Sequence, residues 1–284
     1  QYTDYIKYQN ELVNSDEGAK LWSYWKNELS GELPLLNLPA NKPRPAVQTF
    51  NGKTEYFTID NDLVIRIKEL SKKEGVTLFV MLQTIYQIFL HRYTGQNEII
   101  VGSPTAGRNQ TEFENIVGYF INPVAVKGTF SENISFSEFL QQIKKKVIGA
   151  ISNQDFPFSI IVDRLLQRRD PSRTPVFQTF FGLQKVQKND DIQEMLVPGN
   201  KGNQIHWGKF LIESFELPQQ EGQFDLTAEF IEGQNSFDGA FKFNTDLFDD
   251  EMMKQMVSHF QILLNDIVSF PETKISEFKL LPEK

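Results

Sequence analysis

The segment TLFVMLQTIYQIFLHRYTG, residues 77–95, constrains this chain more than any other. Read as a helix, it is apolar nearly all round, and a helix with no polar face must be buried among other elements. Thr77 stands where an N-cap is expected, and Gly95 closes the apolar run. We therefore predict a central helix that other elements must cover on several sides.

Strand and helix patterns surround this segment. Helices are predicted over 15–31, 60–75, 135 up to Pro157, 158–167 and 249–269. Strands are predicted over 51–59, 97–104, 175–184, 205–213, 223–232 and 236–245, the last two as a hairpin. Helices alternate with strands early, and strands follow one another late. This order predicts an α/β fold, a two-layer sandwich of a mixed β-sheet with helices on one face.

Two segments fit neither pattern. Residues 32–50 carry clustered prolines that exclude a helix, while their leucines require burial, so we expect an extended segment lying along the surface. Residues 185–204 are polar and contain Gly and Pro, which predicts a long loop or a crossover excursion placed within 185–223.

Composition narrows the classes of function. With 40% hydrophobic and 23% charged residues, the 284-residue chain should fold as a soluble globule. It has no Cys, which excludes disulfides, Cys-ligated metals and a thiol nucleophile, and fits a cytoplasmic protein. A net charge of −8 argues against nucleic acid as a partner. No apolar run reaches the roughly 20 residues of a membrane span, so no membrane partner is expected.

The N-terminus and the histidines give further expectations. Residues 1–5, QYTDY, lack a starting Met and a signal peptide, and read as if cut from a longer chain. His91, His206 and His259 are far apart, so each is expected to be a core or surface residue, and no metal site is predicted. Phosphate-binding glycine loops and a G-x-S-x-G elbow are absent. The residues alone predict no catalytic constellation.

Several segments, in one order along the chain, match motifs of a known family. YTDYIKYQ, 2–9, is similar to Y-x-D-Y-x-x-W-Q, and GSPTAGR…IVGYFIN, 102–122, to G-x-P-x-A-G-R…(I/V)-G-x-F-(V/I)-N. NQDFPF, 153–158, resembles H-Q-D-x-P-F, and RDPSRTPVF, 169–177, resembles R-D-x-S-R-x-P-L-F. FDLTAEF and FNTDLFD resemble the closing hairpin. The family is the condensation domains of nonribosomal peptide synthetases.

The resemblance implies a fold, a reaction and partners. Residues 1–284 would be the C-terminal subdomain of a condensation domain, a chloramphenicol-acetyltransferase-like lobe, with the N-terminal subdomain absent. The intact domain would be an acyltransferase that joins a carrier-bound donor acyl or peptidyl thioester to a carrier-bound aminoacyl acceptor by amide formation. The lobe would bind no cofactor itself, because the substrates arrive on phosphopantetheine arms. Partners would be the N-terminal lobe, donor and acceptor carrier proteins, and neighbouring adenylation or polyketide modules.

One departure from the family leaves alternatives open. The family's H-H-x-x-x-D-G motif is missing, since no two histidines are adjacent. We therefore expect the catalytic His upstream, no catalytic residue in this chain, and no activity of the lobe alone. One alternative is a non-catalytic condensation-like docking platform for carrier or tailoring proteins. Another is an epimerising, cyclising or ester-forming sibling.

The motifs also give candidate site residues. The candidates for the substrate tunnel are Arg108, Gly118, Phe120, Asn122 and Asp225. Arg108 and Asp225 are alternatively structural ties. Asn122 either faces the tunnel or forms a bulge satisfied by backbone, because it interrupts an apolar strand. Gly118 should permit a close backbone approach.

The remaining candidates are structural. Asp155, Pro157, Phe158, Asp170 and Arg173 should hold the motifs together, with Asp155 and Arg173 in ion pairs. The phenylalanines of these motifs are expected in the core more than on a substrate; they are Phe120, Phe156, Phe158, Phe177, Phe180 and Phe181.

Overall fold

A mixed six-stranded sheet organises the protein in this computed structural model, which describes residues 1–166, 168–186, 204–215, 221–233 and 237–282. The strand order is β1-β8-β7-β4-β2-β3. The strands are β1 Gly52–Thr58, β2 Glu98–Thr105, β3 Asn122–Thr129, β4 Thr179–Lys185, β7 Leu226–Glu232 and β8 Phe237–Asn244. β4 runs parallel to both β2 and β7, whereas β1, β3 and β8 pair antiparallel with their neighbours.

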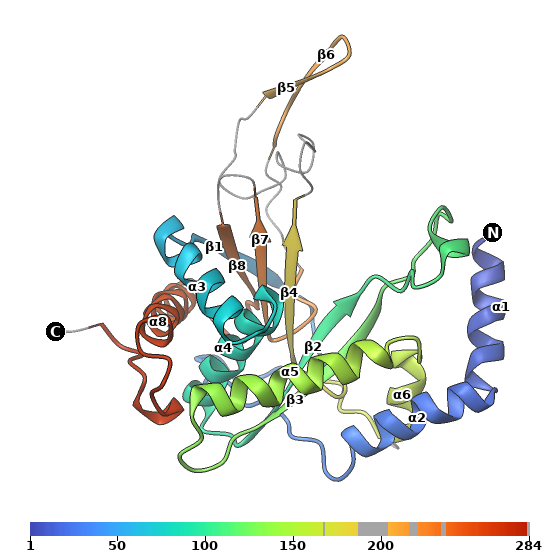
Figure 1. The fold of residues 1–284 in the computed structure, drawn as a ribbon, viewed down its shortest axis with the longest axis horizontal. Coiled ribbons are helices and arrows are strands. Elements are labelled where there is room, and N and C mark those ends of the chain that lie inside the picture. The colour runs from blue at the N-terminus through green and yellow to red at the C-terminus, as the bar shows by residue number, and fades with distance from the viewer. Residues whose placement is uncertain (167, 187–203, 216–220, 234–236, 283–284) are drawn as a thin grey trace.

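Helices cover one face of this sheet (Figure 1). They are α3 Asn61–Lys73, α4 Leu78–Thr94, α5 Phe136–Ser152 and α8 Asp250–Ser269. Three more helices lie beyond β3, at the end of the body that carries the N-terminus: α1 Tyr2–Val13, α2 Asp16–Glu28 and α6 Phe158–Leu165. The short 3₁₀ helices are Thr111–Phe113 and Ile275–Glu277. The predicted sandwich with helices on one face is confirmed.

The predicted central helix is α4. Every residue from Val80 to Leu90 is buried, including the polar ones. The Thr77 hydroxyl accepts a hydrogen bond from the Val80 N–H, and Gly95 closes the helix with a φ of 68°. Burial of apolar surface on all sides, at about 25 cal/mol per Å², makes this helix the centre of the folded core.

Some local predictions were wrong. A helix forms over 2–13, which was not predicted. Residues 205–213 form two strands, not one, because Gly208 takes a φ of 61° and turns the chain between β5 Gln204–Trp207 and β6 Phe210–Glu213. β4 starts at Thr179, later than predicted, since Val176 has a φ of 69°. β3 starts at Asn122, so this residue begins the strand and does not interrupt it.

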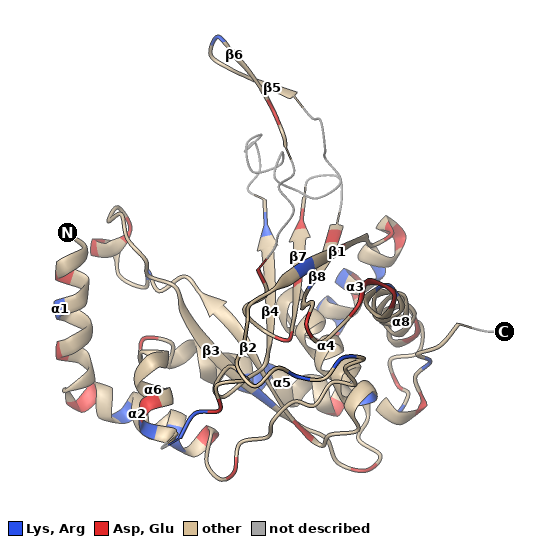
Figure 2. Ribbon diagram, turned by 180° about the vertical axis from the view of Figure 1, so that it is seen from behind, with Lys and Arg blue, Asp and Glu red and all other residues tan. Residues whose placement is uncertain are grey.

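The β5–β6 hairpin is separate from the six-stranded sheet and projects beyond its end (Figure 1). The predicted excursion over 185–223 extends outside the described residues, at 187–203 and 216–220, and stays a prediction. Lys and Arg are interspersed with Asp and Glu along the described elements (Figure 2). Within the described ranges, no helix is long and apolar enough to cross a membrane.

Residues 32–50 run extended over the body, as predicted, without helix or strand. We call them the strap. Hydrogen bonds fasten it along its length: Lys42 N–H donates to the Leu247 carbonyl at 3.2 Å, and Gln48 N–H to the Pro171 carbonyl at 2.9 Å. Its prolines have no backbone N–H to donate to a neighbouring strand, so the strap cannot pair along its length as a β-strand. Side chains and loops supply its hydrogen-bond partners instead.

Candidate functional site

Asn122 holds the segment that leads into α6. Its Nδ2 donates to the carbonyls of Gln154 and Phe156 at 2.7 and 2.9 Å, and its Oδ1 accepts from the Phe158 N–H at 3.0 Å. Pro157, the N-cap residue of α6, is buried between these partners. The amide is therefore fully engaged by backbone, and its contact with a substrate stays a prediction.

Arg108 ties the loop after β2 to itself. Its Nη1 donates to the carbonyls of Phe113 at 2.5 Å and Ile116 at 2.8 Å. The guanidinium lies 4.0 Å from the centre of the Phe120 ring, which adds a cation–π contact. Gly107 beside it has a φ of 66°, and a Cβ there would stand 1.9 Å from the Phe120 carbonyl oxygen. Arg108 thus shapes the loop from within; a role in lining the tunnel stays a prediction.

This loop docks on α1 through a small aromatic cluster. Tyr5, Phe113 and Phe120 are buried together, apart from the main core. Tyr2 joins them edge-on to Phe120, and its hydroxyl donates to the Tyr119 carbonyl at 2.5 Å. A Cβ on Gly118 would lie 2.2 Å from the Tyr2 ring, so only glycine allows this approach.

Asp155 lies at the edge of the same cluster. Its Oδ1 accepts from the Asn109 Nδ2 at 2.6 Å, whereas none of the ion pairs among the described residues includes it. The predicted ion pair is therefore replaced by a hydrogen bond to an amide. Burial, followed by Tyr2 and Asp155, raises the pKa of Tyr5; burial and then Asp155 raise the pKa of Tyr8.

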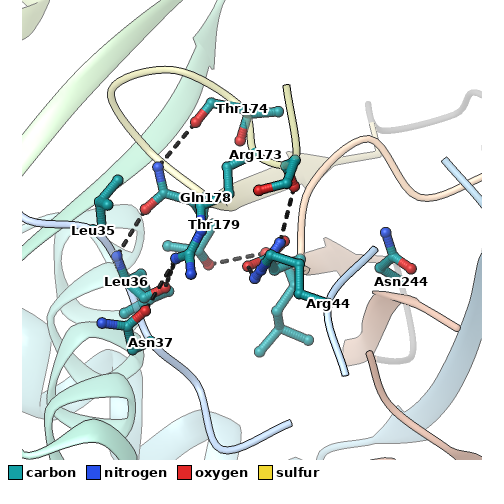
Figure 3. A network of polar contacts seen from close by, with 12 residues as sticks. Leu35, Leu36, Asn37, Arg44, Arg173, Thr174, Gln178, Thr179 and Asn244 are labelled. Atoms are coloured by element: carbon teal, nitrogen blue, oxygen red, sulfur yellow. Dashed lines mark hydrogen bonds and ion pairs between the residues drawn. The ribbon is translucent and has the colours of Figure 1, made fainter. Parts of the chain in front are cut away.

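The other polar candidates contact the strap or one another, and Figure 3 shows Arg173 beside Leu36, Asn37 and Arg44 of the strap. Arg44 makes a two-pronged ion pair with Asp225, with Nη1 at 3.0 Å from Oδ1 and Nη2 against Oδ2, and Nη1 also reaches the Ser172 carbonyl at 3.2 Å. The Asp225 side chain is only 4% exposed and that of Arg44 21%. A carboxylate this deeply buried requires such a partner. Asp225 is thus engaged as a structural tie.

Arg173 joins the strap to the 170–178 loop (Figure 3). Its Nε lies 3.9 Å from Asp170 Oδ2, and its Nη1 donates to the Leu36 carbonyl and to Asn37 Oδ1 at 3.2 and 3.0 Å. The predicted ion pair of Arg173 is present. Hydrogen bonds from the hydroxyl and N–H of Ser172 hold the pKa of Asp170 below its usual value.

The sequence did not single out two central members of this network. Gln178 is fully buried; its Oε1 accepts from the Leu36 N–H at 2.8 Å and its Nε2 donates to the Thr174 carbonyl at 2.9 Å. Arg44 was missed as well. Both carried a usable signal, since Arg44 is a single cation between two prolines of a segment predicted to lie along the surface with its leucines buried, and Gln178 is a single amide among aromatic residues.

Aromatic rings connect the two groups of candidates. Phe158 lies 5.0 Å from Phe177, Phe177 lies 5.7 Å from Phe224, and Phe224 stacks on Phe180 at 4.9 Å with an interplanar angle of 4°. Phe120, Phe156, Phe177 and Phe181 are buried as expected, whereas Phe158 and Phe180 are partly exposed.

A cavity of about 380 Å³ adjoins the strap network. Its walls are largely aliphatic, from Leu29, Leu33, Leu165 and Val176, and Arg168 and Arg173 add cations. Arg169 is a third cation in this lining, and Glu32 and Asp170 add two carboxylates, so the cavity combines aliphatic walls with charges of both signs.

The histidines take no part in these groups. His91 stacks on Phe130 at 4.1 Å, and His259 Nδ1 lies 2.6 Å from the Tyr93 hydroxyl, which can donate to it. His206 is exposed on β5. Within the described part of the chain, no cluster of His, Asp and Glu could hold a metal ion.

A model of the Condensation domain family matches residues 1–284. The chain is 35% identical over 284 residues to Gramicidin S synthase 2 of Aneurinibacillus migulanus, covering 100% of this chain and 6% of the relative. It is 33% identical over 286 residues to Bacitracin synthase 2 of Bacillus licheniformis, covering 100% of this chain and 10% of the relative. The chain therefore spans a small fraction of the curated relatives it matches.

Solved structures agree with this match. A four-domain nonribosomal peptide synthetase bound to AMP and glycine superposes with a TM-score of 0.91 at 28% identity, over 99% of this chain and 22% of that chain. The X-domain from teicoplanin biosynthesis has the same fold, with a TM-score of 0.85 at 21% identity, over 99% of this chain and 62% of that one.

Proposed function

This chain belongs to the condensation-domain family, and we propose that it is the C-terminal lobe of a peptide synthetase condensation domain. The proposal is carried by the family match over residues 1–284, seen together with the structural superposition on the X-domain. In that superposition, this chain covers only 62% of the X-domain chain. The unmatched part of that domain leaves room for a second lobe. The intact domain would act in the cytoplasm.

In the proposed reaction, the amine nitrogen of a carrier-bound aminoacyl acceptor attacks the carbonyl carbon of a carrier-bound donor thioester. A C–N bond forms, the C–S bond breaks, and the proton lost by nitrogen passes to the leaving thiolate. Phosphopantetheine arms on the two carrier proteins would supply the thiols. Adenylation or polyketide modules would lie next to the domain.

The described residues of this lobe would position the reactants. Its histidines are occupied elsewhere or exposed on β5, so the general base, or the group that orients the amine, is expected upstream in the absent H-H-x-x-x-D-G motif. We therefore propose that the lobe alone makes no amide. Asn122, Arg108 and the Arg44–Asp225 pair would fix the loops that form one wall of the site.

The test is an assay of amide formation by the parent synthetase. A segment that begins about 150 residues upstream, one lobe in length, is mixed with donor- and acceptor-loaded carrier proteins, and the acceptor carrier is analysed by intact mass. We expect dipeptidyl carrier from the long segment and none from residues 1–284. Adding a separately purified N-lobe to residues 1–284 should restore part of the amide formation seen with the long segment. If the long segment forms neither amide nor ester with its natural carriers, catalysis is refuted.

A second candidate function is docking without catalysis. It is supported by the fold shared with an X-domain whose structure was solved in complex with OxyB, at 21% identity and a TM-score of 0.85. The upstream sequence and the product separate the possibilities. Epimerisation changes no mass, cyclisation removes water, and an ester is cleaved by mild base, whereas a docking platform leaves every carrier unchanged.

A further inference from the structure

The six-stranded sheet divides between β2 and β4. These parallel neighbours are paired at one position only, Gly102 with Phe180, and their carboxyl ends then diverge (Figure 1). β4 remains paired with β7 from Thr179 to Lys185 on its other side. Past the Gly102–Phe180 pair, the side of β4 that faces β2 is therefore an unpaired edge inside the sheet.

The hydrogen bonds show which backbone groups are left on this edge. In a parallel ladder, successive residues turn their N–H and C=O groups to opposite sides. Asp225 N–H donates to the Gln178 carbonyl and Val186 N–H to the Glu232 carbonyl, so the even-numbered residues face β7. The odd-numbered residues face β2, and after Phe181 the next of them is Leu183. Its N–H and C=O have no strand partner among the described residues.

The opposite side of the divergence cannot complete the ladder. Asn97 accepts from the Phe130 N–H, which places the odd-numbered residues of β2 toward β3 and the even-numbered ones toward β4. After Gly102, the next even-numbered residue is Pro104, which has no N–H. A chain lying between the strands would find a donor and an acceptor on Leu183 and only an acceptor on Pro104.

Gly182 supports the same interpretation. A Cβ on Gly182 would have a single neighbour within 4 Å among the described residues, the Glu229 Cγ at 3.7 Å. At Gly102, by contrast, a Cβ would stand 2.2 Å from the Phe177 ring. Glycine weakens a strand and typically marks a place where another backbone or a ligand approaches closely. The protein's own packing explains Gly102 but not Gly182.

The position also agrees with a general rule. From β2 the chain continues to β3 on one side, and β4 has β7 and β8 on the other, so the strand order reverses between them. Ligands of open α/β sheets bind at such switch points, at the carboxyl ends of the strands. The partly exposed, stacked rings of Phe180 and Phe224 lie beside it, one of them on β4 itself.

We infer that the edge of β4 around Leu183 binds an extended chain that carries secondary amides, by adding it as a strand beside Gly182. The inference rests on the proposed function and deepens it. The pantetheine arm and a peptidyl donor both carry such amides, and backbone recognition serves any side chain. Leu183 is a positioning residue in this scheme, because its backbone holds the chain and takes no part in bond formation.

The test is a binding measurement that needs no turnover. Residues 1–284 are labelled with ¹⁵N-leucine, and the Leu183 amide resonance is followed while pantetheine or N-acetyl-dialanine-methylamide is added. We expect Leu183 to shift and to gain protection from hydrogen exchange at saturation. Gly182→Val should raise the dissociation constant about tenfold, the factor for a loss of about 1.4 kcal/mol. Thr227→Val, on the same sheet face but on β7, should change it less than about twofold.

The outcomes separate the two sources of the amides. A response to pantetheine alone assigns the edge to the arm, a response to the peptide alone assigns it to the peptidyl donor, and a response to both assigns it to either chain. An unchanged Leu183 resonance with both probes at saturation overturns the inference. If Gly182→Val does not fold, Gly182→Ala replaces it and the wild-type Leu183 result decides. A Leu183 response combined with no amide formation by the parent synthetase would refute the proposed function and leave this binding site standing.

Discussion

Replacing Asn122 with alanine tests whether this side chain stabilises the fold or contacts a substrate. The substitution removes three hydrogen bonds to the backbone of 154–158, at 2.7, 2.9 and 3.0 Å. A typical hydrogen bond contributes about 0.5–1.5 kcal/mol net, and half-buried partners regain part of this from water. We expect a loss of about 2–3 kcal/mol, or roughly 4–12 °C in Tm for a chain of this size. Differential scanning calorimetry measures it.

Asn122→Asp sharpens the test. The aspartate keeps the acceptor for Phe158 N–H but turns a carboxylate oxygen toward the carbonyls of Gln154 and Phe156, so it should destabilise at least as much as alanine. Asn27→Ala, on the exposed surface of α2, is the matched control and should stay within about 0.5 kcal/mol. If Asn122→Ala melts at the wild-type temperature, the amide does not stabilise the fold. The tunnel alternative would then be the better one.

Two further predictions follow from the ion pair and from a buried phenol. Arg44→Met leaves the Asp225 carboxylate buried without its partner and should lower the free energy of unfolding by about 3 kcal/mol. Adding Asp225→Leu to this variant should recover most of the lost stability. Equal Tm values for the wild type and Arg44→Met would contradict this prediction. Burial raises the pKa of Tyr93 from 10.0 to about 12. The folded state therefore favours the neutral phenol, and its contribution to stability is full below pH 10 and lost as pH rises to 12. Tyr93→Phe should lessen the fall of Tm between these pH values, and an unchanged fall would count against the assignment.

The fold was largely predictable because its strongest signals are local. An all-round apolar helix over 77–95 can only be central, and capping residues fixed the ends of several helices, as Ser135 does for α5. The errors have separate physical causes. α1 has Tyr5 as its only buried residue, so its periodicity was too weak to predict a helix. Gly208 makes a turn within residues 205–213, but the apolar residues on either side of it follow the pattern of one continuous strand.

The site was predictable in its motifs but not in its contacts. Asn122, Arg173 and Asp225 were chosen because they stand in the family's motifs, and each does make side-chain hydrogen bonds. Their partners come from segments far away in sequence, such as Arg44 for Asp225, and no spacing rule connects residues separated by 181 positions. Backbone carbonyls, which satisfy much of Asn122 and Arg108, leave no mark in a sequence at all.

Within the lobe, the side chains that stabilise the fold differ from the groups that can bind a ligand. The polar candidates for the tunnel, Asn122, Arg108 and Asp225, are bonded to the protein's own backbone and charges, which leaves them little capacity to bind a ligand. The unpaired backbone of β4 and the partly exposed rings of Phe180 and Phe224 keep such capacity. A lobe built this way would recognise the common backbone of its substrates through β4, while the rings would meet their variable apolar groups. Selectivity among substrates should then respond to changes at Phe180 and Phe224, and overall affinity to changes at Gly182.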